Sequence, residues 1–232
     1  MRLLLENVTI ARDGIDRLGP VSLCHDLSGI TCVLGHNGAG KSLFLRTVHG
    51  LIDPDAGRVT WDGAAAFETR RRRGFMFQTP PVMRRSVADN VAFPLLAAEV
   101  GASERRQRVA SALEDAGLTA LARQPAATLS GGEKQRMALA RALVIAPEVM
   151  LLDEPCANLD PAATRLLEAT LRRVTADGVQ VLMSTHDIAQ ARRLADHVLL
   201  FAAGAVVFSG PANRFFDQTD IADVENFKRG YI

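Results

Sequence analysis

The sequence lacks any apolar run long enough to cross a membrane. Its longest apolar runs, Val149–Leu152 and Val198–Ala203, have the length of buried strands, whereas a membrane-spanning helix needs about 20 apolar residues. The opening residues 1–7 become charged too soon for a secretory signal. We therefore expect a cytoplasmic protein that stays at a membrane only when a partner holds it there.

An excess of one charge is also missing. With 27 lysines and arginines against 26 aspartates and glutamates, the net charge is +1, so the chain has no overall field to attract nucleic acid. The three cysteines, Cys24, Cys32 and Cys156, show no CxxC spacing, and their odd number argues against a disulfide framework. We expect reduced thiols and no nucleic-acid partner.

What the sequence does contain is an alternation of short apolar strands and helices. Its 232 residues fit a single α/β domain, residues 1–232, and the alternation predicts a mostly parallel, doubly wound sheet. The expected strands are Arg2–Ile10, Thr31–Leu34, Gly74–Gln78, Val149–Asp153, Val179–Ser184 and a terminal hairpin, His197–Ser209, that turns at Ala203-Gly204. Three helices are expected between and after them, from residue 42 to about Leu51, at Pro161–Ala176 and at Asp187–Ala195.

A block of helices interrupts this alternation. The helices expected there are Ser86–Val100, Ser103–Ala116 and a third that Ser130 opens and that runs through Ala146. We expect residues from about 79 to 147 to form an inserted helical subdomain. The α/β core would then comprise about residues 1–78 and 148–210, and residues 211–232 would be a short tail.

Residues 35–42 match the phosphate-binding pattern G-x-x-x-x-G-K-[ST] in full. Glycines allow backbone N–H groups to close round phosphate oxygens, and the start of the following helix adds a partial positive charge. Lys41 can reach the β- and γ-phosphates, and Ser42 offers a hydroxyl to Mg²⁺. The candidate nucleotide-binding residues are Gly35, His36, Asn37, Gly38, Ala39, Gly40, Lys41, Ser42 and Leu43. The alternative is a plain glycine-rich turn between a strand and a helix.

Two acids end the apolar strand Val149–Asp153. Beside the phosphate-binding loop, Asp153 would hold Mg²⁺, in part through water, and Glu154 would orient and polarise an attacking water as general base. Taken without the loop, the two acids could equally be solvated residues at the end of a strand.

Between these motifs lies Leu129-Ser130-Gly131-Gly132-Glu133-Lys134-Gln135-Arg136, and with it the chain resembles the ATP-binding cassette family of ATPases. Ser130 caps a helix whose free N–H groups, from Gly131 and Gly132, can point at a γ-phosphate. The resemblance implies the α/β fold of a P-loop NTPase, with a RecA-like, mostly parallel sheet, an N-terminal antiparallel β portion and the inserted helices. It also implies a head-to-tail homodimer in which ATP lies between the lysine-bearing loop of one copy and Ser130–Gly132 of the other.

The remaining family elements follow in order. The resemblance implies that Gln78 contacts Mg²⁺ and the attacking water, that His186 contacts the γ-phosphate, and that residues 158–160 cross the dimer interface. The predicted catalytic residues are Lys41, Glu154 and His186, the predicted metal ligands are Ser42, Gln78 and Asp153, and Gln78, Ser130, Gly131, Gly132 and Arg12 join the predicted nucleotide site. ATP and Mg²⁺ are the implied cofactors.

The implied partners are integral membrane permease subunits, docked near Gln78–Ser86 at the cytoplasmic face of the bacterial inner membrane, with a solute-binding protein as an indirect partner. In that segment we expect Val82 and Met83 to be exposed and to form an apolar docking surface flanked by arginines. The run Arg70–Arg73 is either a nucleic-acid or lipid patch or a solvated loop before a strand.

Three residues depart from the family pattern. Arg12 stands where an aromatic side chain usually stacks on adenine, so it either recognises the base weakly or is a simple surface arginine. Leu43 replaces a common hydroxyl residue and forfeits a contact worth about 1 kcal/mol. Cys156, after Asp153-Glu154-Pro155, is either just a small residue or a redox group.

These motifs do not identify the transported substrate, the cargo, because such an ATPase subunit does not contact it. Residues 78–87, with His49-Gly50-Leu51 and Phe215-Phe216, are similar to ATPase subunits of bacterial tungstate importers. Importers of phosphate, molybdate or amino acids are alternatives, as is an efflux or lipoprotein-release system. A non-transport family member acting on ribosomes or DNA is a further alternative.

Overall fold

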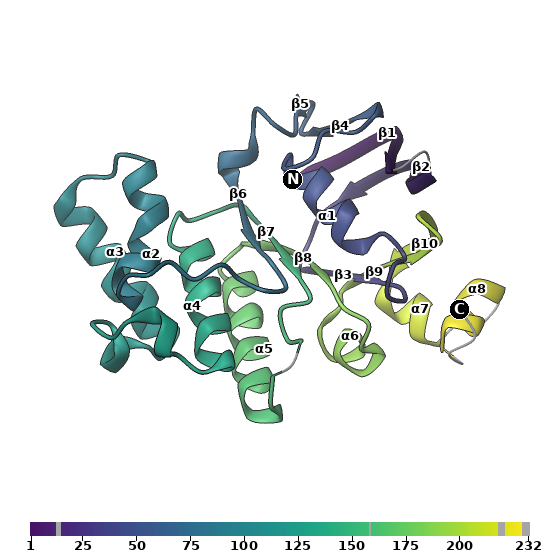
Figure 1. Cartoon of the computed structure of the whole chain (residues 1–232). Helices are drawn as coiled ribbons and strands as arrows, with labels where there is room; N and C mark the ends of the chain where they lie inside the picture. The colour runs from purple at the N-terminus through teal and green to yellow at the C-terminus, as the bar shows by residue number, and fades with distance from the viewer. Residues whose placement is uncertain (13–14, 158, 218–220, 229–232) are drawn as a thin grey trace.

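The computed structural model describes residues 1–12, 15–157, 159–217 and 221–228, which form an α/β fold on two sheets (Figure 1). The first sheet has the order β2-β1-β4-β5, and its pairings are antiparallel. Its strands are β1 (Arg2–Arg12), β2 (Ile15–Asp26), β4 (Ala56–Trp61) and β5 (Ala64–Ala65). This sheet confirms the expected N-terminal antiparallel portion, although β1 alone had been predicted as an individual strand.

The second sheet has the order β10-β9-β3-β8-β7-β6. Its strands are β3 (Ile30–Leu34), β6 (Arg73–Met76), β7 (Val149–Asp153), β8 (Gln180–Ser184), β9 (His197–Ala202) and β10 (Ala205–Pro211). Neighbouring strands from β9 to β6 pair in parallel, and β10 pairs antiparallel with β9. The mostly parallel sheet predicted from the alternation of strands and helices is therefore confirmed.

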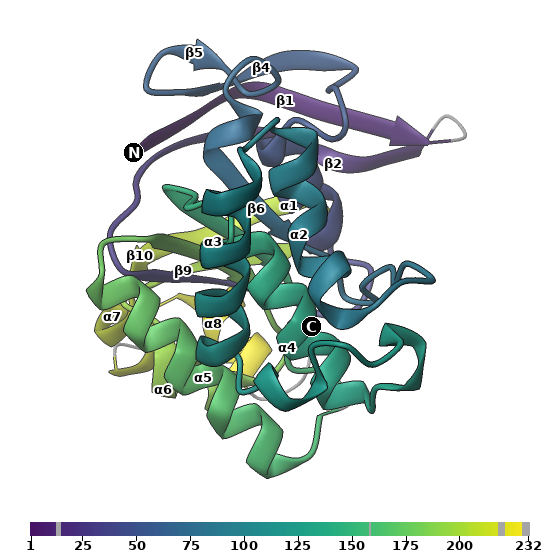
Figure 2. The ribbon, with the colours of Figure 1, turned by 90° about the vertical axis from the view of Figure 1, so that its left-hand side faces the viewer.

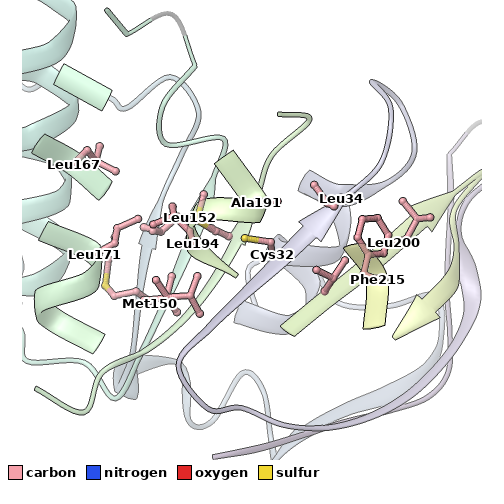
Figure 3. Close-up of a cluster of buried hydrophobic side chains, with 14 of the residues drawn as sticks. Cys32, Leu34, Met150, Leu152, Leu167, Leu171, Ala191, Leu194, Leu200 and Phe215 are labelled. Carbon is pink, nitrogen blue, oxygen red and sulfur yellow. The ribbon is translucent and has the colours of Figure 1, made fainter. Parts of the chain in front are cut away.

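Both faces of the parallel sheet are covered, which explains why its strands are continuous apolar runs. Successive side chains of a strand point to opposite faces. In β7, Met150 and Leu152 therefore pack into one buried cluster with the helices on that side, as Figure 3 shows, whereas Val149 and Leu151 pack into another. The second cluster also contains the inner faces of α1 (Lys41–His49) and of the antiparallel sheet, so α1 lies between the two sheets (Figure 1).

The helical insert has a core of its own. It contains α2 (Val87–Ala97), α3 (Ala102–Asp115) and α4 (Gly131–Leu143), with two 3₁₀ turns between α3 and α4 at Thr119–Leu121 and Ala126–Thr128; a further 3₁₀ turn, Arg70–Arg72, precedes β6. Val91 from α2, Leu113 from α3 and Met137 from α4 are buried together in this core. Figure 2 shows α2 and α3 standing beside α4, in front of the parallel sheet. The insert is confirmed, and its boundaries at about residues 79 and 147 stay a prediction.

Side-chain caps fix where several helices begin. Ser86 accepts a hydrogen bond from the N–H of Asp89 at the start of α2. Asp160 caps α5 (Pro161–Ala176), and Asp187 caps α6 (Ile188–Leu194), in the same way. Each cap satisfies N–H groups that the first turn of a helix leaves without partners. Within the described residues, the helices are all too short or too polar to span a membrane.

The region predicted to be a short tail, residues 211–232, is helical in its described part. The described part of this region forms α7 (Ala212–Asp217) and α8 (Ala222–Lys228). Phe215 and Phe227 are 0% and 4% exposed, in the same cluster as Met150 and Leu152. Helices of six and seven residues are too short to show a helical period in sequence, so the packing of their aromatic side chains was missed.

The arginine run before β6 is neither a free basic patch nor a solvated loop throughout. Arg73 is only 2% exposed, and its guanidinium donates hydrogen bonds to the carbonyls of His49 and Ala66 and lies over the ring of Trp61. Arg72 forms an ion pair with Glu148 at 2.6 Å. Arg73 is therefore a buried structural residue that ties β6 to the end of α1.

Candidate active site

The phosphate-binding loop joins β3 to α1 and depends on glycine at its two ends. At Gly35, with φ of +148°, an added Cβ would lie 2.5 Å from the carbonyl oxygen of Phe201. At Gly40, φ is +100°, a left-handed conformation that glycine adopts without steric cost. The first hydrogen bond of α1 runs from the N–H of Phe44 to the carbonyl of Gly40, so the N–H groups of the first three helix residues remain available to an anion.

Lys41 points back into this loop. Its side chain is 5% exposed, and Nζ donates to the carbonyls of Gly35 at 2.7 Å and His36 at 3.0 Å. Nζ also lies 3.7 Å from Oε1 of Glu154. Burial lowers the pKa of Lys41, and the carboxylate of Glu154 opposes that shift. The loop thus holds a cation beside the N–H groups at the start of α1.

Asp153, at the end of β7, is 1% exposed, and only one of its two carboxylate oxygens accepts hydrogen bonds from the described residues. Its Oδ1 accepts hydrogen bonds from the hydroxyls of Ser42 at 2.8 Å and Ser184 at 2.9 Å. Among the described residues no donor hydrogen bonds to its buried Oδ2, and the nearest cation is Arg46, whose Nη2 lies 3.9 Å away. A hydroxyl beside a carboxylate oxygen without a donor is a ligand set that suits Mg²⁺.

Glu154 follows with its backbone in the left-handed region, at φ of +44°. Its N–H donates to Oγ of Ser184 at 2.9 Å, which helps to hold this unfavourable conformation. Oε2 of Glu154 accepts from Nε2 of Gln78 at 3.3 Å and lies 3.2 Å from Nδ1 of His186. The side chain is 12% exposed, so a carboxylate is aimed at the phosphate-binding loop by contacts from two other loops.

Lys41, Ser42, Gln78, Glu154 and His186 line a cavity of about 840 Å³, and Asp153 lies behind its wall, bonded to Ser42. The lining residues that the sequence had predicted are Asn37, Gly38, Gly40, Lys41, Ser42, Leu43, Gln78, Glu154 and His186. A carboxylate, a lysine and backbone N–H groups around one cavity are a set that can bind a polyphosphate and orient a water beside it. The cavity lies on the edge of the parallel sheet where β3, β7 and β8 end.

Several residues of this site were not predicted. Arg17, from β2, lines the cavity, but no motif marks it and the register of the hairpin shifts along its length. Ser184 bonds both acids, and its position at the end of β8, level with Asp153, could have identified it. Gln135 donates from Nε2 to the carbonyl of Gln78 at 3.1 Å. The side chain of Arg12 and the whole of Asn158 lie outside the described residues.

Ser130, Gly131 and Gly132 do not join this cavity. They begin α4, where Ser130 and Glu133 form a capping box, and Ser130 and Gly131 are exposed. An added Cβ at Gly131 would meet nothing within 4 Å, so the space in front of this helix start is open. Of the predicted nucleotide site, the structure brings together the loop and the acids and leaves these three residues apart.

The segment after Gln78 is held against the helical insert. Nη1 of Arg141 donates to the carbonyl of Pro81 at 2.8 Å, and the buried side chain of Asn90 bonds the backbone of Met83 on both sides. Val82 and Met83 are partly buried, and Val82 packs against the core of the insert. The prediction that both are exposed is wrong, because Val82 packs on that core and Asn90 holds the backbone of Met83 against α2.

Comparison with known proteins gives consistent results. Residues 18–157 match the family model of the ABC transporter. The chain is 41% identical over 231 residues to the nickel import ATP-binding protein NikO of Rhodobacter capsulatus, covering 93% of this chain and 91% of that protein. It is 34% identical over 247 residues to a phosphate import ATP-binding protein of Natronomonas pharaonis, covering 99% and 87%.

Solved structures agree with these sequence matches. The cbiO1 protein of Clostridium perfringens, part of an ABC transporter complex, superposes with a TM-score of 0.83 at 29% identity, covering 97% of this chain and 94% of that one. A dimeric ATP-binding cassette, in a post-hydrolysis state with ADP and Pi bound, gives a TM-score of 0.82 at 29% identity, covering 90% and 98%.

Proposed function

The chain belongs to the ABC transporter family, and from this premise we propose that it is the ATP-hydrolysing subunit of a membrane importer. The observation that carries the proposal is the placement of Glu154. Its carboxylate lies beside the phosphate-binding loop, within contact of Lys41, Gln78 and His186. The named relatives are ATP-binding proteins of importers, which supports import over export.

In the proposed reaction, water attacks the γ-phosphate of ATP in line with the leaving ADP. Glu154 accepts a proton from that water, while Gln78 and His186, on its Oε2, keep the carboxylate in position. Lys41 and the N–H groups at the start of α1 offset the negative charge that develops on the phosphate oxygens.

Ser42 and Asp153 would hold Mg²⁺, with Gln78 as the third predicted ligand. The donor-free Oδ2 of Asp153 and the hydroxyl of Ser42 fit this ion. Bound Mg²⁺ would neutralise charge on the β- and γ-phosphates. Ser184 positions Asp153 by donating to the other carboxylate oxygen.

We further propose that the site is completed by a second copy of the chain. Ser130 and the N–H groups of Gly131 and Gly132 would then reach the γ-phosphate held by the partner's loop. The open space in front of Gly131 and the dimeric state of the solved ATP-binding cassette support this arrangement.

The direct test of the proposed function is Glu154→Gln. Without a base to accept the proton we expect kcat to fall about a thousandfold, with ATP still bound and a dimer accumulating on a sizing column. Glu148→Gln is the matched control, because Glu148 does not line the ATP cavity and its carboxylate forms an ion pair with Arg72 at the surface. Unchanged turnover in Glu154→Gln would remove Glu154 from the mechanism.

For the cargo, we propose an oxyanion such as tungstate, on the likeness of residues 78–87 to tungstate importers. Phosphate, molybdate and amino acids are alternatives, and the phosphate and methionine import relatives favour two of them. A metal cation is a second candidate, favoured by the 41% identity to a nickel import protein. The membrane subunit and its solute-binding protein would be co-purified with the chain, and tungstate, phosphate, methionine and Ni²⁺ titrated into the solute-binding protein. Tight binding of Ni²⁺ alone would exclude the oxyanion.

Two rival functions share the same site. An efflux or lipoprotein-release ATPase would hydrolyse ATP by the same chemistry, so the direction of transport in sealed vesicles separates it from an importer. A non-transport ATPase acting on ribosomes or DNA would be stimulated by them in the absence of a membrane partner. Stimulation by the co-purified membrane subunit supports our proposal against the second rival.

A further inference from the structure

One cation in the ATP cavity has no role in the reaction proposed above. Arg17, from β2, lines the cavity together with Gly40, Lys41 and Leu43, and its side chain is exposed. Nζ of Lys41 is held by two backbone carbonyls and lies beside Glu154. By contrast, none of the groups that the structure describes forms a hydrogen bond or an ion pair with the guanidinium of Arg17. The cavity therefore contains a guanidinium that is available to an anion.

The pairing of β2 with β1 passes over Arg17. Leu18 pairs with Ile10 and Asp16 pairs with Ala11, so Arg17 is an extra residue without a partner on β1. An extra residue of this kind interrupts the alternation of side chains along a strand, and such irregularities are common beside active sites, where they redirect a side chain. The side chain of Arg17 lines the ATP cavity, whereas that of Leu18 is buried in the cluster between the two sheets.

Close backbone packing fixes the point from which this side chain starts. The carbonyl oxygen of Arg17 would lie 3.2 Å from a Cβ added at Gly40 and 3.0 Å from one added at Gly204. Gly204 lies in the turn between β9 and β10; its N–H donates to the carbonyl of Ala39 at 3.1 Å, and its carbonyl accepts from the N–H of Gly19 at 2.8 Å. The backbone of Arg17 is therefore held against the residue that precedes α1, the helix whose first N–H groups would bind phosphate.

We propose that the guanidinium of Arg17 binds the α-phosphate of ATP. The proposal rests on the proposed function, because it adds a residue to the same nucleotide site. In the parallel sheet, β3 leads into the phosphate-binding loop, with β8 and β7 on one side of it and β9 and β10 on the other. Glu154 follows β7, whereas Arg17 packs beside the turn between β9 and β10. With the γ-phosphate beside Glu154, the α-phosphate would lie toward the side on which Arg17 stands.

The surroundings of Arg17 favour a phosphate oxygen over the base as its partner. A guanidinium can donate two parallel hydrogen bonds to a phosphate group. Among the described lining residues the lysines and arginines are Lys41 and Arg17, and Lys41 is already turned toward Glu154. Leu43 offers no hydroxyl to the same phosphate. Because the α-phosphate is common to all nucleotides, Arg17 would strengthen binding without selecting the base.

The test measures Kd by calorimetry with the full chain, in the presence of Mg²⁺, for ATP, GTP and inorganic tripolyphosphate. Tripolyphosphate has three phosphates but neither base nor ribose. In Arg17→Ala we expect Kd to rise about tenfold or more for all three, because a charge-assisted contact is lost. Arg17→Lys keeps the charge without the fork, so its Kd should lie between the two. Arg17→Phe could stack on a base but has no donor for phosphate, and it should bind as weakly as Arg17→Ala.

Arg71→Ala is the matched control, because Arg71 is exposed and does not line the ATP cavity. Its Kd values should match the wild type, and the Tm of Arg17→Ala should do the same because that side chain is exposed. Equal Kd values for Arg17→Ala and Arg71→Ala would overturn the proposal. A loss seen with ATP but not with tripolyphosphate, or binding restored by Arg17→Phe, would also overturn it, because either result would place Arg17 on the base.

Failure of the proposed function gives a different result. If the wild type bound neither ATP nor tripolyphosphate, the nucleotide site itself would fail, and the role of Arg17 with it. Wild-type binding that Arg17→Ala leaves unchanged would overturn the role of Arg17 alone.

Discussion

At the phosphate-binding loop the charged side chains contact one another within a single chain, whereas at the start of α4 Ser130 contacts only its own first turn. Lys41, Asp153 and Glu154 are 12% exposed or less; Lys41 forms an ion pair with Glu154, and Asp153 accepts a hydrogen bond from Ser42. Ser130 and Gly131 are exposed and face open space. The two regions carry equally specific motifs, yet one copy of the chain assembles a network of contacts only around the phosphate-binding loop.

The difference shows which part of the proposed chemistry is preorganised. A charge that is held in place before the substrate arrives costs little reorganisation during the reaction. Lys41 and Glu154 are held in that way, so they can act as soon as ATP binds. The helix start at Gly131 has well-placed N–H groups but no ligand within reach in one copy, so its contribution would depend on association.

The largest effect is expected from Lys41→Ala. The substitution removes a buried cation whose Nζ is fixed by two carbonyls, and it leaves Glu154 without its ion pair. We expect kcat/KM for ATP to fall about a thousandfold or more, because charge stabilisation of this kind contributes several kcal/mol. Steady-state ATPase assays measure this, with Lys134→Ala as the control at a lysine outside the cavity. A loss of less than tenfold would show that the loop is not preorganised around Lys41.

The second-largest effect is expected from Gly131→Asp, at the start of α4. An added side chain meets nothing within 4 Å in one copy, and an acid suits the first turn of a helix, so the fold should be as stable as the wild type. Activity should nevertheless fall about a hundredfold, because the carboxylate would repel the partner's γ-phosphate. Thermal unfolding and ATPase assays together separate these two results, and Gly131→Ala serves as the smaller control.

Mixing the two variants tests whether the phosphate-binding loop and the start of α4 belong to one site. Lys41→Ala and Gly131→Asp, each inactive alone, should form mixed dimers in which one of the two sites is whole. Random pairing should then restore about a quarter of the wild-type activity. Activity no higher than the mean of the two variants would mean that each copy encloses its own nucleotide, and the two regions would not belong to one site.

A smaller effect is expected from Ser184→Ala. Its hydroxyl donates to Asp153 and accepts from the N–H of Glu154, whose backbone is strained. Losing both bonds should lower kcat about tenfold, because the acids lose orientation and not charge. Rescue by Ser184→Thr, which keeps the hydroxyl, would confirm a positioning role.

The smallest effect is expected from Glu133→Ala in the capping box. Hydrogen bonds from Ser130 lower the pKa of Glu133, so the cap stabilises the folded chain above the ordinary pKa of 4.5 and is lost as pH falls below it. At pH 7 the substitution should cost about 1 kcal/mol and lower Tm by about 2–4 °C. At pH 3 the difference in Tm from the wild type should shrink. A constant difference at both pH values would show that Glu133 acts through packing.

The sequence predicted the parallel sheet and most of the site for a specific reason. The predicted site residues at β3 and β7 stand at the ends of continuous apolar runs, and glycines or prolines mark where these runs stop. The ends of the strands in a parallel sheet meet at one edge, so the sequence alone was enough to place Lys41, Asp153 and Glu154 together.

The missed features depend on contacts between distant segments. Arg17 reaches the ATP cavity only through a hairpin whose register shifts at three places, and register cannot be read from one strand. Arg73 looks like its three neighbours in sequence and differs from them in lying over Trp61 against the end of α1. The partial burial of Val82 and Met83 depends on the helical insert, whose core contacts Val82 and whose Asn90 bonds the backbone of Met83.

The last described helix has a practical consequence. The ring of Phe227, in α8, meets the ring of His36 edge-on, with their centroids 5.1 Å apart, so the far end of the chain braces the loop that would cradle ATP. A protein shortened after Gly210 would lose this brace and uncover the aromatic surface of Phe208, and we expect it to aggregate on expression. Purification tags or fluorescent reporters would be better inserted at the exposed turn near Gly101, which does not line the ATP cavity.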